Sequence, residues 1–381
     1  MMDSNRYWVG FNLVKGIGAI RFKSLLDHFG SAERAWQAPA DVLAQIGLPQ
    51  KALENLLILR NKDDLDQVWE RITEQKIKVL TLLDDDYPPM LKEIAVPPPV
   101  LYIRGTLDEG DRFSVAIVGT RRMTNYGHQV TQAQAAHLAA NNVTVVSGLA
   151  RGVDAVAHKA ALDAGGRTIA VLGSGVDVIY PSEHRKLAQE IVANGAIISD
   201  YAPGTPPEGV NFPPRNRIIS GLSMAIIVVE AGERSGALIT ANFAAEQGRE
   251  VYAVPGNIDR VQSKGTNALI RQGARPLLNK EEVLGDLSLN QVSAYRQAHL
   301  FLPENGLEAE LFELVKNEPL HIDEICSQSS ISVDRVTASL VMMELKGLVR
   351  QVDNMRYQAI GEERSGYQTS DREGDSDFER T

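Results

Sequence analysis

The chain has 381 residues, of which 44% are apolar and 23% charged, which excludes a disordered chain and predicts two or three folded domains. Cys326 is the only cysteine, so an internal disulfide framework and a CxxC metal site are both excluded. The formal net charge of −10, taken over the whole chain, argues against a nucleic-acid binder.

Residues 1–83 are predicted to form a small helical module. Helices expected at 5–14 and 19–29 flank Gly16-Ile17-Gly18, and a second pair flanks Ile46-Gly47-Leu48. This pattern indicates a helix-hairpin-helix or SAM-like module, whose turn can present N–H groups to a DNA phosphate. It is equally typical of an αα-hairpin in which glycine only permits a tight turn. The acidic balance of residues 1–112, 14 basic against 17 acidic, favours the second interpretation.

Residues 84–112 are interpreted as a proline-rich connector. They run from Asp84-Asp85-Asp86-Tyr87-Pro88-Pro89 through Pro97-Pro98-Pro99 to a short apolar stretch at 100–104. Proline runs restrict the chain to extended conformations and are typical of a domain junction.

Residues 113–285 alternate between short apolar runs and helical stretches. Strands are expected at 115–118, 143–146, 168–172, 197–199, 225–229 and 251–254, and helices at 127–141, 153–164, 183–194 and 238–247. This alternation predicts an α/β domain with a Rossmann-like, doubly wound parallel sheet.

The C-terminal part is predicted to hold a linker at 286–304, a winged helix at 305–360 and a disordered acidic tail at 361–381. Three helices (307–316, 321–327 and 333–347) precede a β-ribbon (348–352 and 355–359), which is the winged-helix order. Residues 306–360 carry 5 basic and 9 acidic side chains. This balance favours a protein contact or non-specific binding over base reading by the third helix.

Several loops of the central domain combine glycine with hydroxyl or arginine side chains. They are Gly119-Thr120-Arg121-Arg122, residues 147–154, Gly173-Ser174-Gly175 and residues 235–240. Helix N-termini after parallel strands present free N–H groups, so these loops are predicted to bind anions. Residues 113–285 carry 16 basic and 14 acidic side chains and form the one net positive part of the chain.

No catalytic constellation stands out. The chain lacks a G-x-G-x-x-G after the first central strand, a Walker loop and an HExxH pair. His158 is interpreted as a packed or capping residue, and Asp154 and Asp200 as residues that orient loops rather than bind metal. We therefore predict a protein that is not an enzyme and that has no cofactor and no metal.

The run Asn211-Phe212-Pro213-Pro214-Arg215-Asn216-Arg217 is the most informative polar segment. Guanidinium groups bind phosphates, and an aromatic ring stacks on a base for about 1–3 kcal/mol. The alternative is that these arginines pair with carboxylates such as Glu230 while Phe212 packs in the core. The segment alone does not decide between the two.

The central domain resembles the DNA-processing protein A (DprA/Smf) family. The matching segments include VAIVGTRR at 115–122, SGLARGVDAVAHKAAL at 147–162, NFPPRNRIISGLS at 211–223 and VVEAGERSGALITANFAAEQGREVYAVPG at 228–256. The segment DYPPMLKEIAVPPPVLYIRG at 86–105 is also similar. The family carries common N-terminal helical and C-terminal winged-helix extensions, and both parts of this chain fit them.

The resemblance implies a protein that protects incoming single-stranded DNA and loads RecA onto it during natural transformation and homologous recombination. It also implies a cytoplasmic homodimer that pairs through the Rossmann-like domain and has no membrane contact. The absence of a signal segment and of a run of ~18 apolar residues fits this expectation. The implied DNA-binding residues are Gly119, Thr120, Arg121, Arg185, Lys186, Phe212, Arg215, Asn216, Arg217, Ser235 and Gly236.

Two other functions remain open from the sequence. One is a Rossmann-like nucleotide hydrolase related to lysine-decarboxylase-like phosphoribohydrolases, which depend on a P-G-G-x-G-T-x-x-E motif. This chain has only Pro255-Gly256-Asn257 and, separately, Gly265-Thr266. The other is a winged-helix transcription regulator with a ligand-sensing α/β domain.

Overall fold

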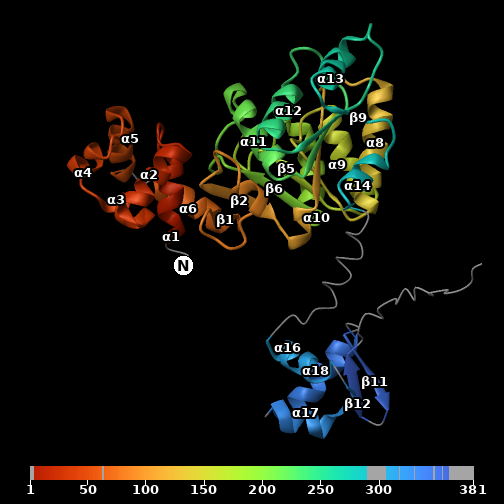
Figure 1. The fold of residues 1–381 in the computed structure, drawn as a ribbon. Helices are drawn as coiled ribbons and strands as arrows, with labels where there is room; N and C mark the ends of the chain where they lie inside the picture. The colour runs from red at the N-terminus through yellow and green to blue at the C-terminus, as the bar shows by residue number, and fades with distance from the viewer. Residues whose placement is uncertain are drawn as a thin grey trace, which may run out of the picture. The chain divides into compact units, whose positions relative to one another are not determined.

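The computed structural model contains two compact units, Met1–Ser293 and Ala294–Thr381 (Figure 1). It describes residues 4–61, 64–289, 306–316, 318–329, 331–345, 348–353 and 355–359. The predicted tail at 361–381 and the linker beyond residue 289 therefore lie outside the described residues. In the part of the chain that is described, no helix is long and apolar enough to cross a membrane.

The larger unit is built on one nine-stranded sheet with the order β1-β2-β6-β5-β4-β3-β7-β8-β9. The strands from β6 to β9 in this order are all parallel. They are β3 (Ser114–Val118), β4 (Thr144–Ser147), β5 (Thr168–Val171), β6 (Gly195–Ser199), β7 (Ala225–Val228), β8 (Glu250–Ala253) and β9 (Arg275–Pro276). All six predicted strands are present, so the prediction of a Rossmann-like α/β sheet is confirmed.

Helices cover both faces of this sheet, because successive residues of a strand point to opposite sides. Val115 and Ile117 pack on one face, which is covered by α8 (Asn125–Ala140), α9 (Val153–Asp163), α10 (Arg185–Asn194) and α14 (Glu282–Asp286). Ala116 and Val118 pack on the other, under α7 (Pro89–Lys92), α11 (Phe212–Gly221), α12 (Gly236–Glu246) and α13 (Val261–Arg271). Short 3-10 turns lie at Glu109–Arg112, Ser182–His184 and Gly209–Asn211.

The helix α11 was not predicted, because Pro213-Pro214 reads as a helix breaker. In the structure α11 begins at Phe212, and proline occupies its first turn. Proline is favoured there, since the first N–H groups of a helix have no partner within it. The polar run 211–217 is therefore the start of a helix, and its side chains point in different directions around the helix axis.

The end of the predicted helical module and the predicted connector each contribute one strand to the sheet, β1 and β2 respectively. β1 (Lys78–Thr81) pairs antiparallel with β2 (Val100–Gly105), and β2 pairs antiparallel with β6. These two strands were not predicted, since the prolines around them favour irregular structure. Leu289, which lies inside the predicted linker at 286–304, is also buried in the core of the larger unit, so this unit extends at least to residue 289.

The N-terminal module packs against β1 and β2 at this edge of the sheet. Its helices are α1 (Ser4–Leu13), α2 (Ala19–Phe29), α3 (Ala32–Gln37), α4 (Ala40–Gln45), α5 (Gln50–Arg60) and α6 (Asp64–Glu74). Trp8 and Phe22 meet edge to face, with ring centroids 4.8 Å apart, and Phe11 packs beside them. The predicted helix pairs around Gly16-Ile17-Gly18 and around Ile46-Gly47-Leu48 are confirmed.

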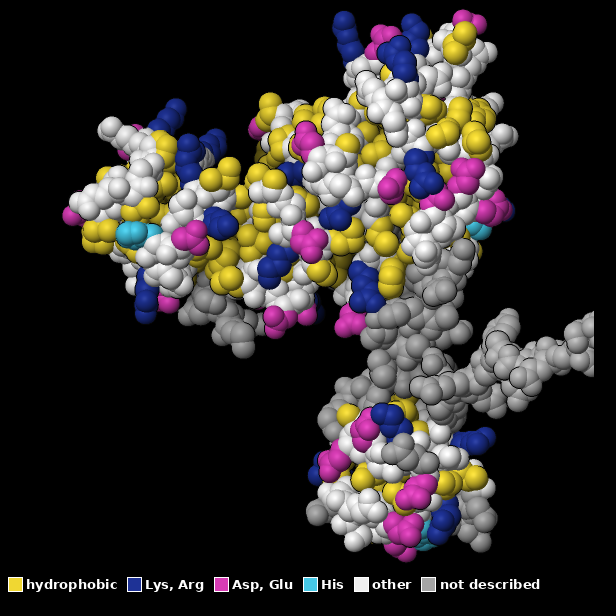
Figure 2. Space-filling view, in the orientation of Figure 1, with side chains coloured by type: hydrophobic (Ala, Val, Ile, Leu, Met, Phe, Trp, Pro, Cys, Tyr) yellow, Lys and Arg dark blue, Asp and Glu magenta, His cyan; other side chains and the backbone are white. Residues whose placement is uncertain are grey.

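The smaller unit is a winged helix, as predicted. α16 (Gly306–Leu314), α17 (Ile322–Ser329) and α18 (Val333–Leu345) pack around Leu311, Ile325 and Leu340. β11 (Val349–Asp353) and β12 (Arg356–Ala359) form the ribbon, and β10 (Leu320–His321) adds a third strand that was not predicted. Figure 2 shows acidic side chains among basic and apolar ones on the visible surface of this unit.

Candidate nucleic-acid interface

A pocket of about 1030 Å³ opens where β3 and β7 end. From β3 the sheet extends to β4 on one side and to β7 on the other, so the pocket lies at the switch point where ligands bind in doubly wound sheets. Its walls come from the loops after β3 and β7 and from the first turns of α11 and α12. Eight of the predicted DNA-binding residues line it: Gly119, Thr120, Arg121, Phe212, Arg215, Asn216, Ser235 and Gly236.

Phe212 forms an aromatic wall of this pocket. Its half-buried ring lies 5.8 Å from the guanidinium carbon of Arg121 and 5.8 Å from that of Arg215. The ring of Tyr180, which also lines the pocket, is 5.9 Å away and tilted by 40°. An aromatic face beside guanidinium groups offers both a stacking surface and a phosphate ligand.

Arg215 lies beneath the pocket rather than at its mouth. It is 5% exposed, and its Nη1 donates to the main-chain oxygens of Gly148 and Val171. Burial lowers the pKa of Arg215 to about 10, while the nearby Asp154 carboxylate favours the charged form. Burial also raises the pKa of Asp154, against the opposing effect of Arg215. Arg215 therefore holds the pocket floor together, and its implied role as a DNA-binding residue stays a prediction.

Two glycines allow this floor to pack so closely. A Cβ atom on Gly148 would lie 2.7 Å from Nη2 of Arg215 and 2.8 Å from Oδ2 of Asp154. A Cβ atom on Gly173 would lie 2.9 Å from the ring of Phe212. The loop Gly173-Ser174-Gly175 thus supports the aromatic wall from behind and does not line the pocket itself.

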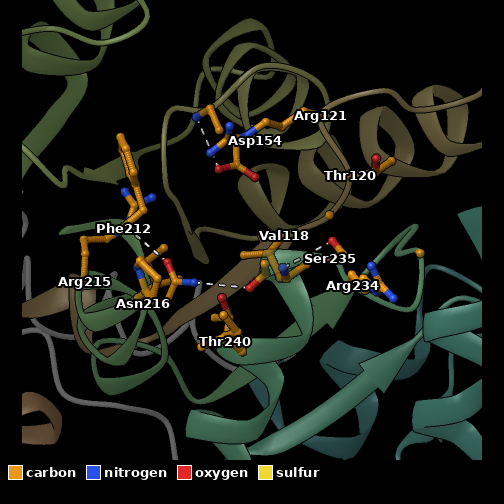
Figure 3. Close-up of a pocket in the computed structure, with 18 of the residues that line it drawn as sticks. Val118, Thr120, Arg121, Asp154, Phe212, Arg215, Asn216, Arg234, Ser235 and Thr240 are labelled. Carbon is orange, nitrogen blue, oxygen red and sulfur yellow. Dashed lines mark hydrogen bonds between the residues drawn. The ribbon is translucent and has the colours of Figure 1, made fainter. Parts of the chain in front are cut away.

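The wall formed by α12 is held by side-chain contacts to the helix terminus. Ser235 caps α12 by accepting a hydrogen bond from the Ala237 N–H at 3.3 Å. Asn216, 8% exposed, donates to the Gly236 oxygen at 3.3 Å. Figure 3 shows the α11 residues Phe212 and Asn216 on one side of the pocket and Arg234 on the other.

Two arginines that line the pocket were not among the implied DNA-binding residues, although Arg122 belongs to the loop Gly119-Thr120-Arg121-Arg122 that was predicted to bind anions. Arg122 and Arg234 are exposed, and within the described residues neither side chain forms a hydrogen bond or an ion pair. Arg122 directly follows the predicted Arg121, and Arg234 directly precedes Ser235. Their position next to implied DNA-binding residues is the feature of the sequence that could have identified them as part of the site.

Three predicted residues lie outside the pocket. Arg185 lines a separate cavity next to α10, and Lys186 is exposed on that helix. Arg217 points away from the pocket and forms an ion pair with Asp200, with Nη2 2.8 Å from Oδ2. The backbone oxygen of Asp200 accepts a hydrogen bond from Asn12 of α1. Arg217 therefore contributes to the junction with the N-terminal module, and its assignment to the DNA groove stays a prediction.

The carboxylate Glu230 is not the partner of these arginines. Its two oxygens accept hydrogen bonds from the backbone N–H and the hydroxyl of Thr124, at 2.8 and 2.6 Å. Arg215 instead lies beside Asp154, and Arg217 pairs with Asp200. The alternative that arginines of this run lie beside carboxylates therefore agrees with the structure, but the carboxylates are Asp154 and Asp200 rather than Glu230.

The candidate catalytic residues have structural partners. Asp154 accepts hydrogen bonds from the N–H groups of Gly148 and Ala150, so it orients its loop as expected. His158 is fully buried, its Nδ1 lies 2.6 Å from the Thr168 hydroxyl, and burial lowers its pKa to about 3. In the described part of the chain, no group of three His, Cys, Asp or Glu side chains is arranged to hold a metal.

The residues that weakly resemble a hydrolase motif do not gather in the pocket. Pro255, Gly256 and Asn257 line another cavity, together with Tyr126 and Arg260. Gly265 and Thr266 lie within α13, where Gly265 packs against the backbone of Ala231. This placement does not favour the nucleotide hydrolase.

The chain matches two family models. The model described as DNA recombination-mediator protein A covers residues 78–288, and the model of the DprA winged helix domain covers residues 302–355. A protein named Smf from Synechocystis sp. is 38% identical over 92% of this chain and 98% of its own length. The DNA processing protein DprA of Streptococcus pneumoniae is 42% identical over 56% of this chain and 75% of its own length.

Two solved structures are similar to the chain. The X-ray structure of DprA from Streptococcus pneumoniae has 35% identity and a TM-score of 0.65, and the match covers 74% of this chain and 97% of that one. DprA from Helicobacter pylori has 33% identity and a TM-score of 0.50, covering 56% of this chain and 97% of that one. The Helicobacter pylori structure gives insight into the single-stranded DNA binding mode of that protein.

Proposed function

Because the chain belongs to the DNA recombination-mediator protein A family, we propose that it binds single-stranded DNA in the pocket between α11 and α12. The observation that carries this proposal is the half-buried ring of Phe212 on a wall of an open pocket, 5.8 Å from the guanidinium carbon of the exposed Arg121. Arg121, Arg122 and Arg234 are exposed at this pocket and would bind the strand's phosphates.

The arrangement favours a single strand over a duplex. A base can stack on Phe212 only if it is unpaired, because the face of a base in a duplex is covered by the neighbouring base pairs. Contacts to phosphates and to a base face carry little sequence information. We therefore propose binding that tolerates any sequence, with Arg185 and Lys186 as outer contacts of a strand that leaves the pocket.

We also propose that the bound strand is protected and then transferred to RecA during transformation and recombination, without catalysis by this protein. The family membership supports this step, and the pocket fits it because the described polar groups on its floor hold the loops rather than a reacting group.

A two-step gel-shift experiment tests this function. A long oligonucleotide should shift as a single strand and much less as a duplex, and log affinity should fall by ~0.7 per log unit of salt for each phosphate contact. Adding RecA and ATP should then give faster filament growth than RecA alone. Equal affinity for duplex would contradict the pocket assignment, and unchanged filament growth would contradict the loading role.

We further propose a homodimer that pairs through residues 113–285, as the family resemblance implies. Two pockets in one assembly would bind one strand at two places, which raises affinity without any new contact. The molar mass in solution is expected to be twice that of the 41.7 kDa chain. A monomeric mass at the concentrations used for DNA binding would contradict this.

A further inference from the structure

A second cavity, of about 340 Å³, is lined by residues of β2, β6 and α10. These three elements are labelled in Figure 1. It shares no lining residue with the pocket described above. Its lining includes Arg104 of β2, Ile197 of β6, and Arg185 and Gln189 of α10. The remaining wall is the loop segment Asp177, Val178 and Ile179.

Two guanidinium groups at this cavity are available for an anion. Arg185 is exposed and has no hydrogen bond or ion pair of its side chain within the described residues. Arg104 is half-buried, and its one described contact is a 3.4 Å hydrogen bond from Nη1 to the Val176 oxygen, at the long end of the usual range. Both side chains can therefore turn toward a phosphate without first breaking an ion pair.

The nearest carboxylates do not cancel this charge. Among the described residues that line the cavity, Asp177 is the one acidic residue, and its Oδ1 accepts a hydrogen bond from the Gly204 N–H at 2.8 Å. Glu183, close in sequence to Arg185, is held by Arg151 through two hydrogen bonds of 2.6 and 2.7 Å. Two arginines against one aspartate leave the cavity lining with a net positive charge.

The rest of the lining suits a flat heterocyclic ring. Val178, Ile179, Ala188, Val192 and Ile197 form an apolar surface, and the amide of Gln189 adds a donor and an acceptor at its edge. A cavity whose lining combines two arginines with several apolar side chains fits a phosphate joined to a nucleobase better than it fits a free inorganic anion.

The two sites lie on either side of one short stretch of chain. Ile179 lines the second cavity, and Tyr180, the next residue, lines the first pocket with a side chain that is 43% exposed. A strand that passes from Phe212 over the ring of Tyr180 would therefore lie beside the stretch of chain that also lines the cavity of Arg104 and Arg185. We propose that this cavity is a second nucleotide subsite for the same DNA strand, with Arg104 and Arg185 as its phosphate ligands; this rests on the proposed function of the first pocket.

The test is the affinity of fluorescent oligothymidines of increasing length, starting from a dinucleotide, for the full chain. Arg104→Gln should leave the shortest binding oligomers unaffected and should weaken the long ones by about tenfold or more, as expected when a charge-assisted hydrogen bond is removed. Arg185→Gln should show the same length dependence. Arg121→Gln should weaken oligomers of every length.

Arg34→Gln is the matched control, because Arg34 is an exposed arginine of α3 outside both cavities. Thermal unfolding checks that each variant is folded, and the exposed Arg185 provides the safer variant if Arg104→Gln is unstable. If Arg104→Gln and Arg185→Gln match Arg34→Gln at every length while the wild type binds, the second subsite is wrong and the first pocket stands. If thymidine monophosphate binds and only the cavity variants abolish this, the cavity is a separate small-molecule site and the strand path is wrong.

Discussion

Replacing Arg215 with alanine is expected to lower the free energy of unfolding by about 3–5 kcal/mol, because the buried Asp154 carboxylate loses the charge that compensates it. The change also removes the donor to two buried main-chain oxygens, those of Gly148 and Val171. Chemical denaturation followed by circular dichroism measures the loss. Adding Asp154→Asn to the same variant should restore part of the stability, since it removes the uncompensated charge.

The effect of Arg215→Ala should depend on pH. Burial raises the pKa of Asp154 in the folded protein, and without Arg215 this pKa rises further. A carboxyl with a raised folded-state pKa contributes stability that is complete below the unfolded-state pKa, about 3.9. That contribution is lost as the pH rises through the folded-state pKa. The deficit of the variant relative to wild type should therefore shrink as the pH is lowered from neutral toward that value. A deficit that is small at neutral pH, or that grows on acidification, would show that Arg215 does not stabilise the pocket floor.

Replacing Arg121 with glutamine is expected to weaken single-stranded DNA binding by about 1–3 kcal/mol, which corresponds to about 5- to 150-fold in Kd. Arg121 is exposed in the pocket beside Phe212, so the change removes a phosphate ligand and leaves the packing of the fold intact. A salt-matched anisotropy titration measures the loss. The slope of log affinity against log salt should also become shallower by ~0.7 for each phosphate that the variant no longer binds.

The control for Arg121→Gln is Arg34→Gln, which makes the same change of charge at a remote exposed position. The two variants should have the wild-type melting temperature, and only Arg121→Gln should lose affinity. Equal affinity of the two variants at matched salt would remove the pocket from the DNA-binding surface. This result would be distinct from an unstable protein, because neither side chain is part of the core.

Much of the fold could be predicted from local patterns. The six predicted strands are short apolar runs, and the helices of the winged helix carry apolar residues at helical spacing. In both cases the elements found in the structure match those expected from these patterns. The strand β2 could not be predicted, since prolines precede it and it pairs with β6, almost a hundred residues later. Among the described strands, β1 pairs only with β2 and was therefore missed with it. The helix α11 was missed because two consecutive prolines usually indicate that no helix is present. Proline breaks a helix only in its interior, and Pro213-Pro214 lie in the first turn of α11, where proline is tolerated.

The types of residue at the site could be predicted from the sequence, but the direction in which each side chain points could not. Loops at the ends of parallel strands meet at one edge, so eight of the named residues line one pocket. Which arginine of α11 faces that pocket depends on the helix, since Arg215 and Arg217 are two positions apart and therefore point to different sides. The sequence motif alone does not distinguish Arg215, which is buried and supports the pocket floor, from Arg217, which forms an ion pair with Asp200 near α1.

The antiparallel edge formed by β1 and β2 bears on where this protein can be divided. A fragment cut at the apparent start of the Rossmann-like pattern, residue 113, would leave the hydrogen-bonding edge of β6 unpaired, and an open edge of this kind invites association with other chains. The match to the recombination-mediator family begins at residue 78, the first residue of β1, and ends at residue 288, beside the buried Leu289. The matched segment thus contains all nine strands of the sheet, from β1 to β9, and the proline-rich segment is part of that unit rather than a spacer.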